Sequence, residues 1–250
     1  MKDFNQLVGG GGTHSVTPAF TLAEVLITLG IIGVVAAMTM PTLMASTQKK
    51  ELQTGLQKAY STLSQALMMY ENDNGWPVTS SLGYNQLKPI LMKYINTAKD
   101  CGKGTETTNL ACMPNKAYVS DPDNYKDIYK TFNGRSNINY SAFDDGQFVM
   151  NDNMFVMIEN AYIPGNANTL PNLWISVDVN GFHKRPNRLG QDLFMFQIMD
   201  DGALLPMGAQ GTRFYSETDA NCSRTSTNNM NGAGCTVKAL NDESFWKGMP

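Results

Sequence analysis

The sequence predicts an α+β fold in which one long N-terminal helix packs on an antiparallel β-sheet. Three observations lead to this prediction. An apolar run from Ala19 to Met44 has roughly the length of a membrane span. An amphipathic stretch follows it without a break. In the second half of the chain, short apolar runs alternate with turn sequences, which is typical of antiparallel strands.

The apolar run forms the first part of the helix, over residues 20–45. Its only charged side chain is Glu24, which lies near the start of the run. A carboxylate inside a membrane costs on the order of a few kcal/mol. Another group must therefore compensate Glu24, and the identity of that group bears directly on the function.

The amphipathic part of the helix covers residues 46–74. Apolar side chains recur there mostly three and four residues apart, which places them on one stripe of the helix. The stripe consists of Leu52, Leu56, Ala59, Leu63, Ala66, Leu67 and Tyr70. The Asn72–Gly75 sequence before Trp76-Pro77 is a stop signal, so we expect the helix to end there.

The remaining residues, 75–250, are predicted to form a domain rich in β-strands. Residues 75–135 are expected to be irregular apart from a short helix near residues 87–94, and the strands are expected beyond about residue 137. Asp144-Asp145-Gly146 and Asp200-Asp201-Gly202 each separate apolar runs and indicate hairpin turns. We expect about four to six strands, with one face of the sheet on the helix stripe. The polar C-terminal segment, residues 211–250, is expected to be loop-like.

The four cysteines all follow the apolar run, and their even number is typical of an oxidising compartment outside the cytoplasm. Cys101 with Cys112 and Cys222 with Cys235 are the most economical pairs, although the sequence alone permits three pairings. A zinc site with four cysteine ligands is the alternative, but the closely spaced cysteine pairs of zinc ribbons are missing.

The residues around Glu24 resemble the N-terminal class III signal of type IV pilins and type II secretion pseudopilins. The matching residues are Ala19, Phe20-Thr21-Leu22, Glu24 and Pro41. The resemblance implies that residues 1–19 are a leader, that a prepilin peptidase cuts between Ala19 and Phe20, and that the new amine of Phe20 is methylated. It also implies that Glu24 pairs with this amine on a neighbouring subunit during assembly. The alternative for Glu24 is a carboxylate at the helix N-terminus that the helix dipole favours.

This resemblance leads us to expect a pilin-like fold and a structural subunit of a type IV pilus or of a type II secretion-type filament. The length of the chain favours a minor pilin or a pseudopilin. The implied partners are other pilin or pseudopilin subunits, the prepilin peptidase, the inner-membrane assembly platform and membrane lipid. The subunit would be a single-pass inner-membrane protein before assembly and part of a periplasmic or cell-surface filament afterwards.

A second segment, Asp178 to Asp192, resembles the DVNG…PNxxGxD segment seen in many pilin-like proteins. Asp178 and Asn180 at alternate positions before Gly181 are similar to the start of a calcium loop, and Asp192 is placed to close it. The alternative is a turn in which these side chains bond their own backbone. Calcium is the only cofactor that the sequence suggests.

Nothing in the chain indicates an enzyme or a nucleic-acid-binding protein. The sequence contains no catalytic or phosphate-binding motif, and its net charge of −3 is shared between both signs. Trp76, Trp174 and Trp246 are singly spaced, so we expect them in the core rather than in a binding cleft.

Two other functions remain as alternatives. The first is a membrane-anchored extracytoplasmic binding protein in which the apolar run is a simple anchor. The second is a secreted enzyme with a cleaved signal peptide.

Overall fold

The computed structural model describes residues 20–103, 112, 128–160 and 173–249. The chain forms two compact units, Met1–Thr47 and Gln48–Pro250. One helix, α1 (Leu22–Asn74), begins in the first unit and ends in the second. Its last residue agrees with the predicted stop, and Gly75 follows in the left-handed conformation with φ of +81°.

The first unit contains the apolar part of α1. Residues Leu22–Met40 have a mean hydropathy of 2.2 and are long enough to cross a membrane, and none of them is buried within the protein. A membrane-spanning helix and a signal sequence both have these properties. The described residues therefore include one candidate membrane anchor, near the N-terminus.

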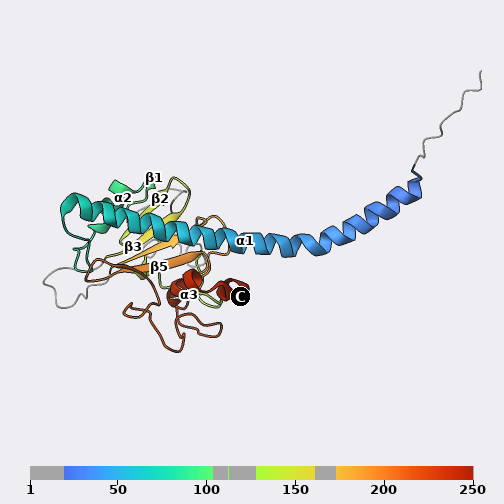
Figure 1. The fold of residues 1–250 in the computed structure, drawn as a ribbon. Helices are drawn as coiled ribbons and strands as arrows, with labels where there is room; N and C mark the ends of the chain where they lie inside the picture. The colour runs from blue at the N-terminus through green and yellow to red at the C-terminus, as the bar shows by residue number, and fades with distance from the viewer. Residues whose placement is uncertain (1–19, 104–111, 113–127, 161–172, 250) are drawn as a thin grey trace, which may run out of the picture. The chain divides into compact units, whose positions relative to one another are not determined.

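In the second unit, α1 lies along the sheet (Figure 1). The side chains of its predicted stripe are buried in the core there, except Tyr70, which is partly buried. Leu56, Ala59 and Leu63 are fully buried. Gly55 makes room for the sheet, because a Cβ atom there would lie 3.1 Å from Cβ of Val179. Polar and exposed side chains occupy the other faces of this part of the helix, which confirms the predicted amphipathic pattern.

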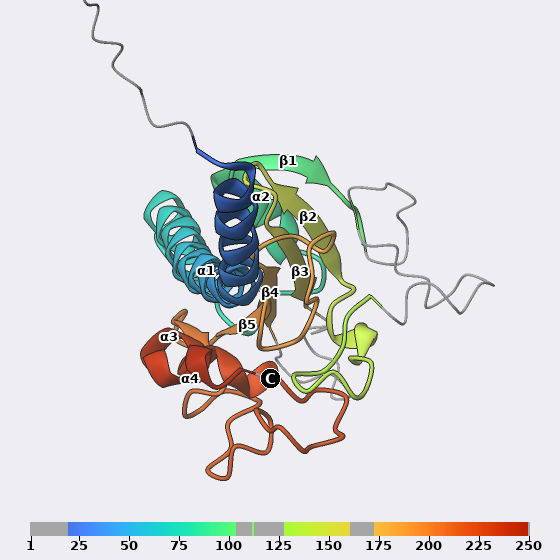
Figure 2. The same cartoon turned by 90° about the vertical axis from the view of Figure 1, so that its right-hand side faces the viewer.

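Within the part of the chain that the structure describes, the sheet has six antiparallel strands arranged in sequence order, at the upper end of the predicted range. Figure 2 shows this order from β1 to β5, with α3 and α4 near β5. The strands are β1 (Thr97–Asp100), β2 (Gly146–Met150), β3 (Phe155–Glu159), β4 (Trp174–Asp178), β5 (Leu193–Ile198) and β6 (Leu204–Pro206). The helices of the second unit after α1 are α2 (Leu87–Tyr94), α3 (Thr236–Asn241) and α4 (Glu243–Lys247).

One face of the sheet packs on the stripe of α1, as predicted. The opposite face is buried as well, which the sequence did not predict. Side chains alternate between the faces along each strand. Val156 and Val177 belong to the core beneath α1 and α2, while Phe155 and Met195 belong to a second core on the opposite face. The second face is covered by side chains from residues 128–143 and 230–233 and by Cys101 and Cys112, which is why β2 to β5 consist of buried residues.

Three predictions about the second unit need correction. The turn between β2 and β3 lies at residues 151–154, because Asp144 and Asp145 precede β2 instead of ending a strand. Strand β1 lies in a region predicted to be irregular. The C-terminal segment is not only loop, because α3 and α4 form there. The turn at Asp200-Asp201-Gly202, between β5 and β6, is confirmed.

The contact of α1 with the sheet predicts a large difference between two truncations on the same helix. Leu63 is fully buried, whereas Met68 is 58% exposed. Leu63→Ala should lower the free energy of unfolding by about 2–5 kcal/mol, because it leaves a cavity. Met68→Ala should change it by less than about 0.5 kcal/mol. Urea unfolding of the full chain in detergent, followed by near-UV circular dichroism, measures both. Equal losses in the two variants would contradict this packing.

Candidate functional site

The first candidate site is the start of α1, where Glu24 is bonded within its own chain. Oε2 of Glu24 accepts a hydrogen bond from the backbone N of Thr21 and another from its Oγ1, each at 2.9 Å. The backbone N of Glu24 donates in turn to Oγ1 of Thr21 at 3.2 Å. This reciprocal arrangement is a capping box, in which two N–H groups at the helix start find side-chain acceptors.

The capping box gives Glu24 a local role at the helix start, in line with the alternative of an N-terminal carboxylate, although the sequence interpretation did not identify Thr21 as its partner. Its signal, a threonine followed three residues later by a glutamate, is present in the sequence. Phe20, next to the predicted cleavage point, is 86% exposed. Ala19 lies outside the described residues. The structure therefore shows how Glu24 is held in a single chain.

The cysteines form the two predicted disulfides, Cys101–Cys112 and Cys222–Cys235. The zinc alternative is wrong, because all four sulfur atoms are used in these bonds. Cys235 is fully buried at the start of α3. Its disulfide ties the C-terminal helices to the polar loop around Cys222.

The segment from Asp178 to Asp192 connects β4 to β5 and brings its two aspartates together. Both are fully buried. The oxygens of Asp192 accept hydrogen bonds from the backbone N of Asn187 and of Arg188, each at 2.6 Å. Asp178 accepts one from the Tyr129 hydroxyl and one from the backbone N of Asn180, the latter at 3.2 Å. Every carboxylate oxygen therefore has a donor from this chain.

Burial and the neighbouring charges raise the pKa values of Asp178 and Asp192. Burial raises the pKa of Asp192 to about 7. Burial and the charge of Asp192 raise the pKa of Asp178 well above its usual value. Burial and the neighbouring Asp178 also raise the pKa of the Tyr129 hydroxyl, so this group stays protonated and donates. Two full negative charges on this buried pair are therefore disfavoured.

These contacts favour the turn alternative for Asp178 and Asp192, because backbone and hydroxyl donors point at their oxygens. Asn180 donates to the carbonyl of Arg185 at 3.3 Å, while the buried Oδ1 atoms of Asn180 and Asn187 accept no hydrogen bond from the described residues. These two side-chain oxygens are therefore available to coordinate a cation. The calcium hypothesis for Asp178, Asn180 and Asp192 stays a prediction. Across the described ranges, no group of three or more His, Cys, Asp or Glu side chains is placed to hold a metal.

A second group of acidic side chains lies where β2 begins and β3 ends. Asp145 accepts a hydrogen bond from the backbone N of Asn160 at 2.8 Å. Oε2 of Glu159 is buried and has no partner in the part of the chain that the structure describes. Burial, with the charges of Asp145 and Asp144, raises the pKa of Glu159 to about 8. Burial and Asp145 raise the pKa of Asp144 to about 6.

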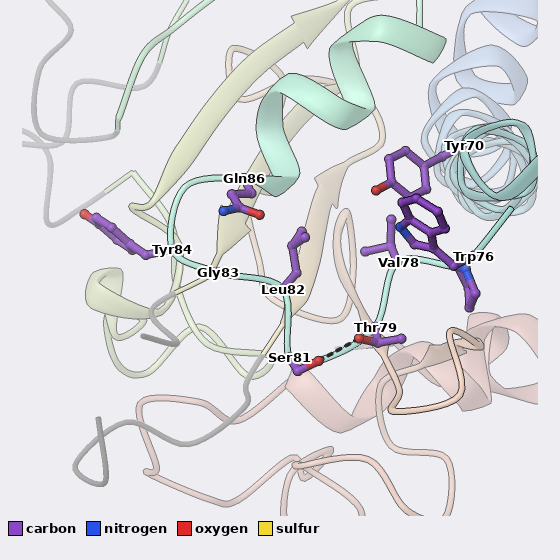
Figure 3. A pocket seen from close by; sticks show the side chains of 10 residues that line it. Tyr70, Trp76, Val78, Thr79, Ser81, Leu82, Gly83, Tyr84 and Gln86 are labelled. Atoms are coloured by element: carbon purple, nitrogen blue, oxygen red, sulfur yellow. Dashed lines mark hydrogen bonds between the residues drawn. The ribbon is translucent and has the colours of Figure 1, made fainter. Parts of the chain in front are cut away.

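The structure also contains a pocket of about 500 Å³ between the end of α1 and the start of α2, drawn in Figure 3. Trp76 lines it and is 63% exposed, whereas Trp174 and Trp246 are 6% and 4% exposed. The prediction that all three tryptophans lie in the core is therefore wrong for Trp76. We call this hollow the Trp76 pocket. It is lined by Tyr70, Trp76, Pro77, Val78, Thr79, Ser81, Leu82, Gly83, Tyr84 and Gln86.

Comparison with known protein families, curated proteins and solved structures finds no match for this chain. Its function is therefore inferred from the residues and contacts described above.

The raised pKa of Glu159 predicts how stability depends on pH. A carboxyl group whose pKa is higher in the folded state stabilises the fold below its unfolded pKa of 4.5, and this contribution is lost as the pH rises through about 8. The free energy of unfolding should therefore fall between pH 6 and pH 9. Thermal unfolding of wild type and Glu159→Gln across this range measures the effect.

Glu159→Gln should be the more stable protein at pH 9, because its side chain carries no charge to bury. Each kcal/mol corresponds to about 2–4 °C in Tm for a domain of this size. The exposed Glu217 provides the matched control, since Glu217→Gln should keep the wild-type pH dependence. A Glu159→Gln variant that loses stability with pH as steeply as wild type would contradict the assignment.

Proposed function

We propose that the chain is a pilin-like structural subunit, a minor pilin or a pseudopilin, of a type IV pilus or a type II secretion-type filament. One observation carries the proposal. Leu22–Met40 is an apolar helical segment that buries nothing within its own chain, although the same helix continues into a stripe that carries a folded domain. An exposed apolar surface of this size requires partners.

The two parts of α1 therefore have different roles in this proposal. Residues after Gln48 anchor the sheet and need no further partner. The apolar side chains of Leu22–Met40 lie in membrane lipid before assembly and pack against other pilin-like subunits afterwards. A Cβ atom added at Gly30 or Gly33 would meet no other atom within 4 Å, so this surface is open to a neighbouring helix.

Glu24 gives the assembly its register. Cleavage between Ala19 and Phe20 by the prepilin peptidase would place a positive amine on Phe20, which is exposed. Both hydrogen bonds from Thr21 use Oε2 of Glu24, and Oε1 accepts none from the described residues. That second oxygen is available to the Phe20 amine of a neighbouring subunit, which compensates the charge in an apolar surrounding.

The proposal implies a path from the inner membrane to a filament. The subunit is held in the inner membrane by its single apolar segment, is processed there, and is drawn into a periplasmic or surface filament by an assembly platform. The two disulfides agree with a domain outside the cytoplasm.

One observation favours a second candidate function. The exposed Trp76 in its pocket is a feature of binding proteins, so the chain is alternatively an extracytoplasmic binding protein with Leu22–Met40 as a simple anchor. This alternative predicts an unprocessed N-terminus. It also predicts that Glu24 contributes nothing beyond its cap.

Mass spectrometry of the mature amino terminus, from a host with a prepilin peptidase, separates the two functions. The pilin-like subunit should begin with N-methylated Phe20, and deletion of the peptidase should restore the leader. An intact Met1 in the presence of the peptidase would contradict the proposal. Glu24→Gln, which keeps a side-chain acceptor for Thr21 but loses the charge, serves as a second arm. It should be processed normally yet fail to enter filaments.

A further inference from the structure

The Trp76 pocket is a feature that the assembly proposal does not use. Trp76 keeps 63% of its surface exposed, although the other two tryptophans are buried. Tyr84, on the same lining, is 42% exposed. Figure 3 shows Tyr70 and Trp76 on the side next to α1, with Leu82 and Gln86 between them and Tyr84. Large exposed aromatic rings around a hollow are typical of ligand sites.

The wall of this pocket is held by contacts from distant parts of the chain. The backbone N of Ser80 donates to the carbonyl of Met199 at 3.2 Å, and its hydroxyl donates to Asp200. The side-chain amide of Asn160 donates to the carbonyl of Leu82 at 3.0 Å. Val78, between these anchors and α1, is 3% exposed. The segment is therefore fixed before any ligand arrives, which lowers the entropic cost of binding.

The chemistry of the lining selects an uncharged ligand with hydroxyl groups. None of the residues that line the pocket is acidic, basic or a histidine. Polar groups are nevertheless present. The hydroxyls of Thr79 and Ser81 lie 2.8 Å apart, and either is able to donate, while Gln86 presents an exposed amide. Aromatic faces attract the C–H faces of a sugar ring, and amides and hydroxyls hydrogen-bond its hydroxyls.

We propose that the Trp76 pocket binds a neutral saccharide. Trp76 supplies the stacking surface, and Gln86 with the Thr79–Ser81 pair fixes the ring by hydrogen bonds. A phosphate, a nucleotide or an acidic peptide would find no cation in the lining to offset its charge. A volume of about 500 Å³ accommodates one or two sugar rings. The inference holds whether the chain is a filament subunit or an anchored binding protein.

The test uses the full chain labelled with 5-fluorotryptophan, in a detergent without a sugar headgroup. Each of the three tryptophans gives its own ¹⁹F signal. Cellobiose, maltose, lactose and N,N′-diacetylchitobiose are titrated to about 20 mM, because an exposed site of this kind has a Kd on the order of 1 mM. At least one of them should shift the Trp76 signal, while the signals of Trp174 and Trp246 stay in place and report an intact fold.

Two tyrosines with equal exposure provide the matched variants. Tyr84 lines the pocket, whereas Tyr215 does not, and both are 42% exposed. Tyr84→Ala should weaken saccharide binding several-fold, and Tyr215→Ala should leave it unchanged. Trp76→Ala, followed by saturation-transfer NMR of the sugar, should abolish it.

The proposal is overturned if none of the four saccharides shifts the Trp76 signal. It is equally overturned if Trp76→Ala still binds, or if Tyr215→Ala weakens binding as much as Tyr84→Ala. A Trp76 signal that moves with protein concentration alone would assign the pocket to a second copy of the chain instead. Digalacturonic acid, an acidic disaccharide, should bind more weakly than the best neutral one.

Discussion

The contact between the apolar stripe of α1 and one face of the sheet is the interaction on which the second unit depends. Leu56 and Leu63 are fully buried there, together with Phe194 from β5. The sheet has a second covered face, closed by side chains from residues 128–143 and 230–233 and by Cys101 and Cys112. The stripe of α1 after Gln48 is buried in the core, whereas no residue of Leu22–Met40 is buried among the described residues. This difference between the buried and the exposed apolar parts of α1 is the basis of the assembly function that we propose.

Glu24 has one role in the single chain and a second role in the filament that we propose. In the single chain, its Oε2 atom accepts hydrogen bonds from the backbone N and the hydroxyl of Thr21, and the backbone N of Glu24 donates to that hydroxyl in turn, so both N–H groups have a partner. In the proposed filament, the same carboxylate meets a positive amine, which offsets the cost of placing a charge among apolar helices. The cap also orients the carboxylate at the helix start, so that assembly needs no rearrangement of the side chain.

Features set by neighbouring residues were predictable from the sequence, and features set by distant contacts were not. The stripe of α1, its end at Asn74, the disulfide pairs and the Asp200–Gly202 turn all have local signals. The β2–β3 turn was missed because Asn153 adopts a φ of +68°, a role for which glycine is the usual signal. The segment that follows Trp76 is held by contacts of Ser80 with Met199 and of Leu82 with Asn160, which no local pattern reveals. The burial of Glu159 likewise follows from strand pairing and not from its neighbours in sequence.

The central claim is that Leu22–Met40 packs against other subunits. A photo-crosslinking amino acid at Val34, which is 57% exposed on this segment, tests it in cells that assemble the filament. The account predicts covalent adducts with a second pilin-like subunit, and predicts that Glu24→Gln removes them while membrane insertion persists. Adducts with lipid alone, or protein adducts that do not depend on Glu24, would contradict it.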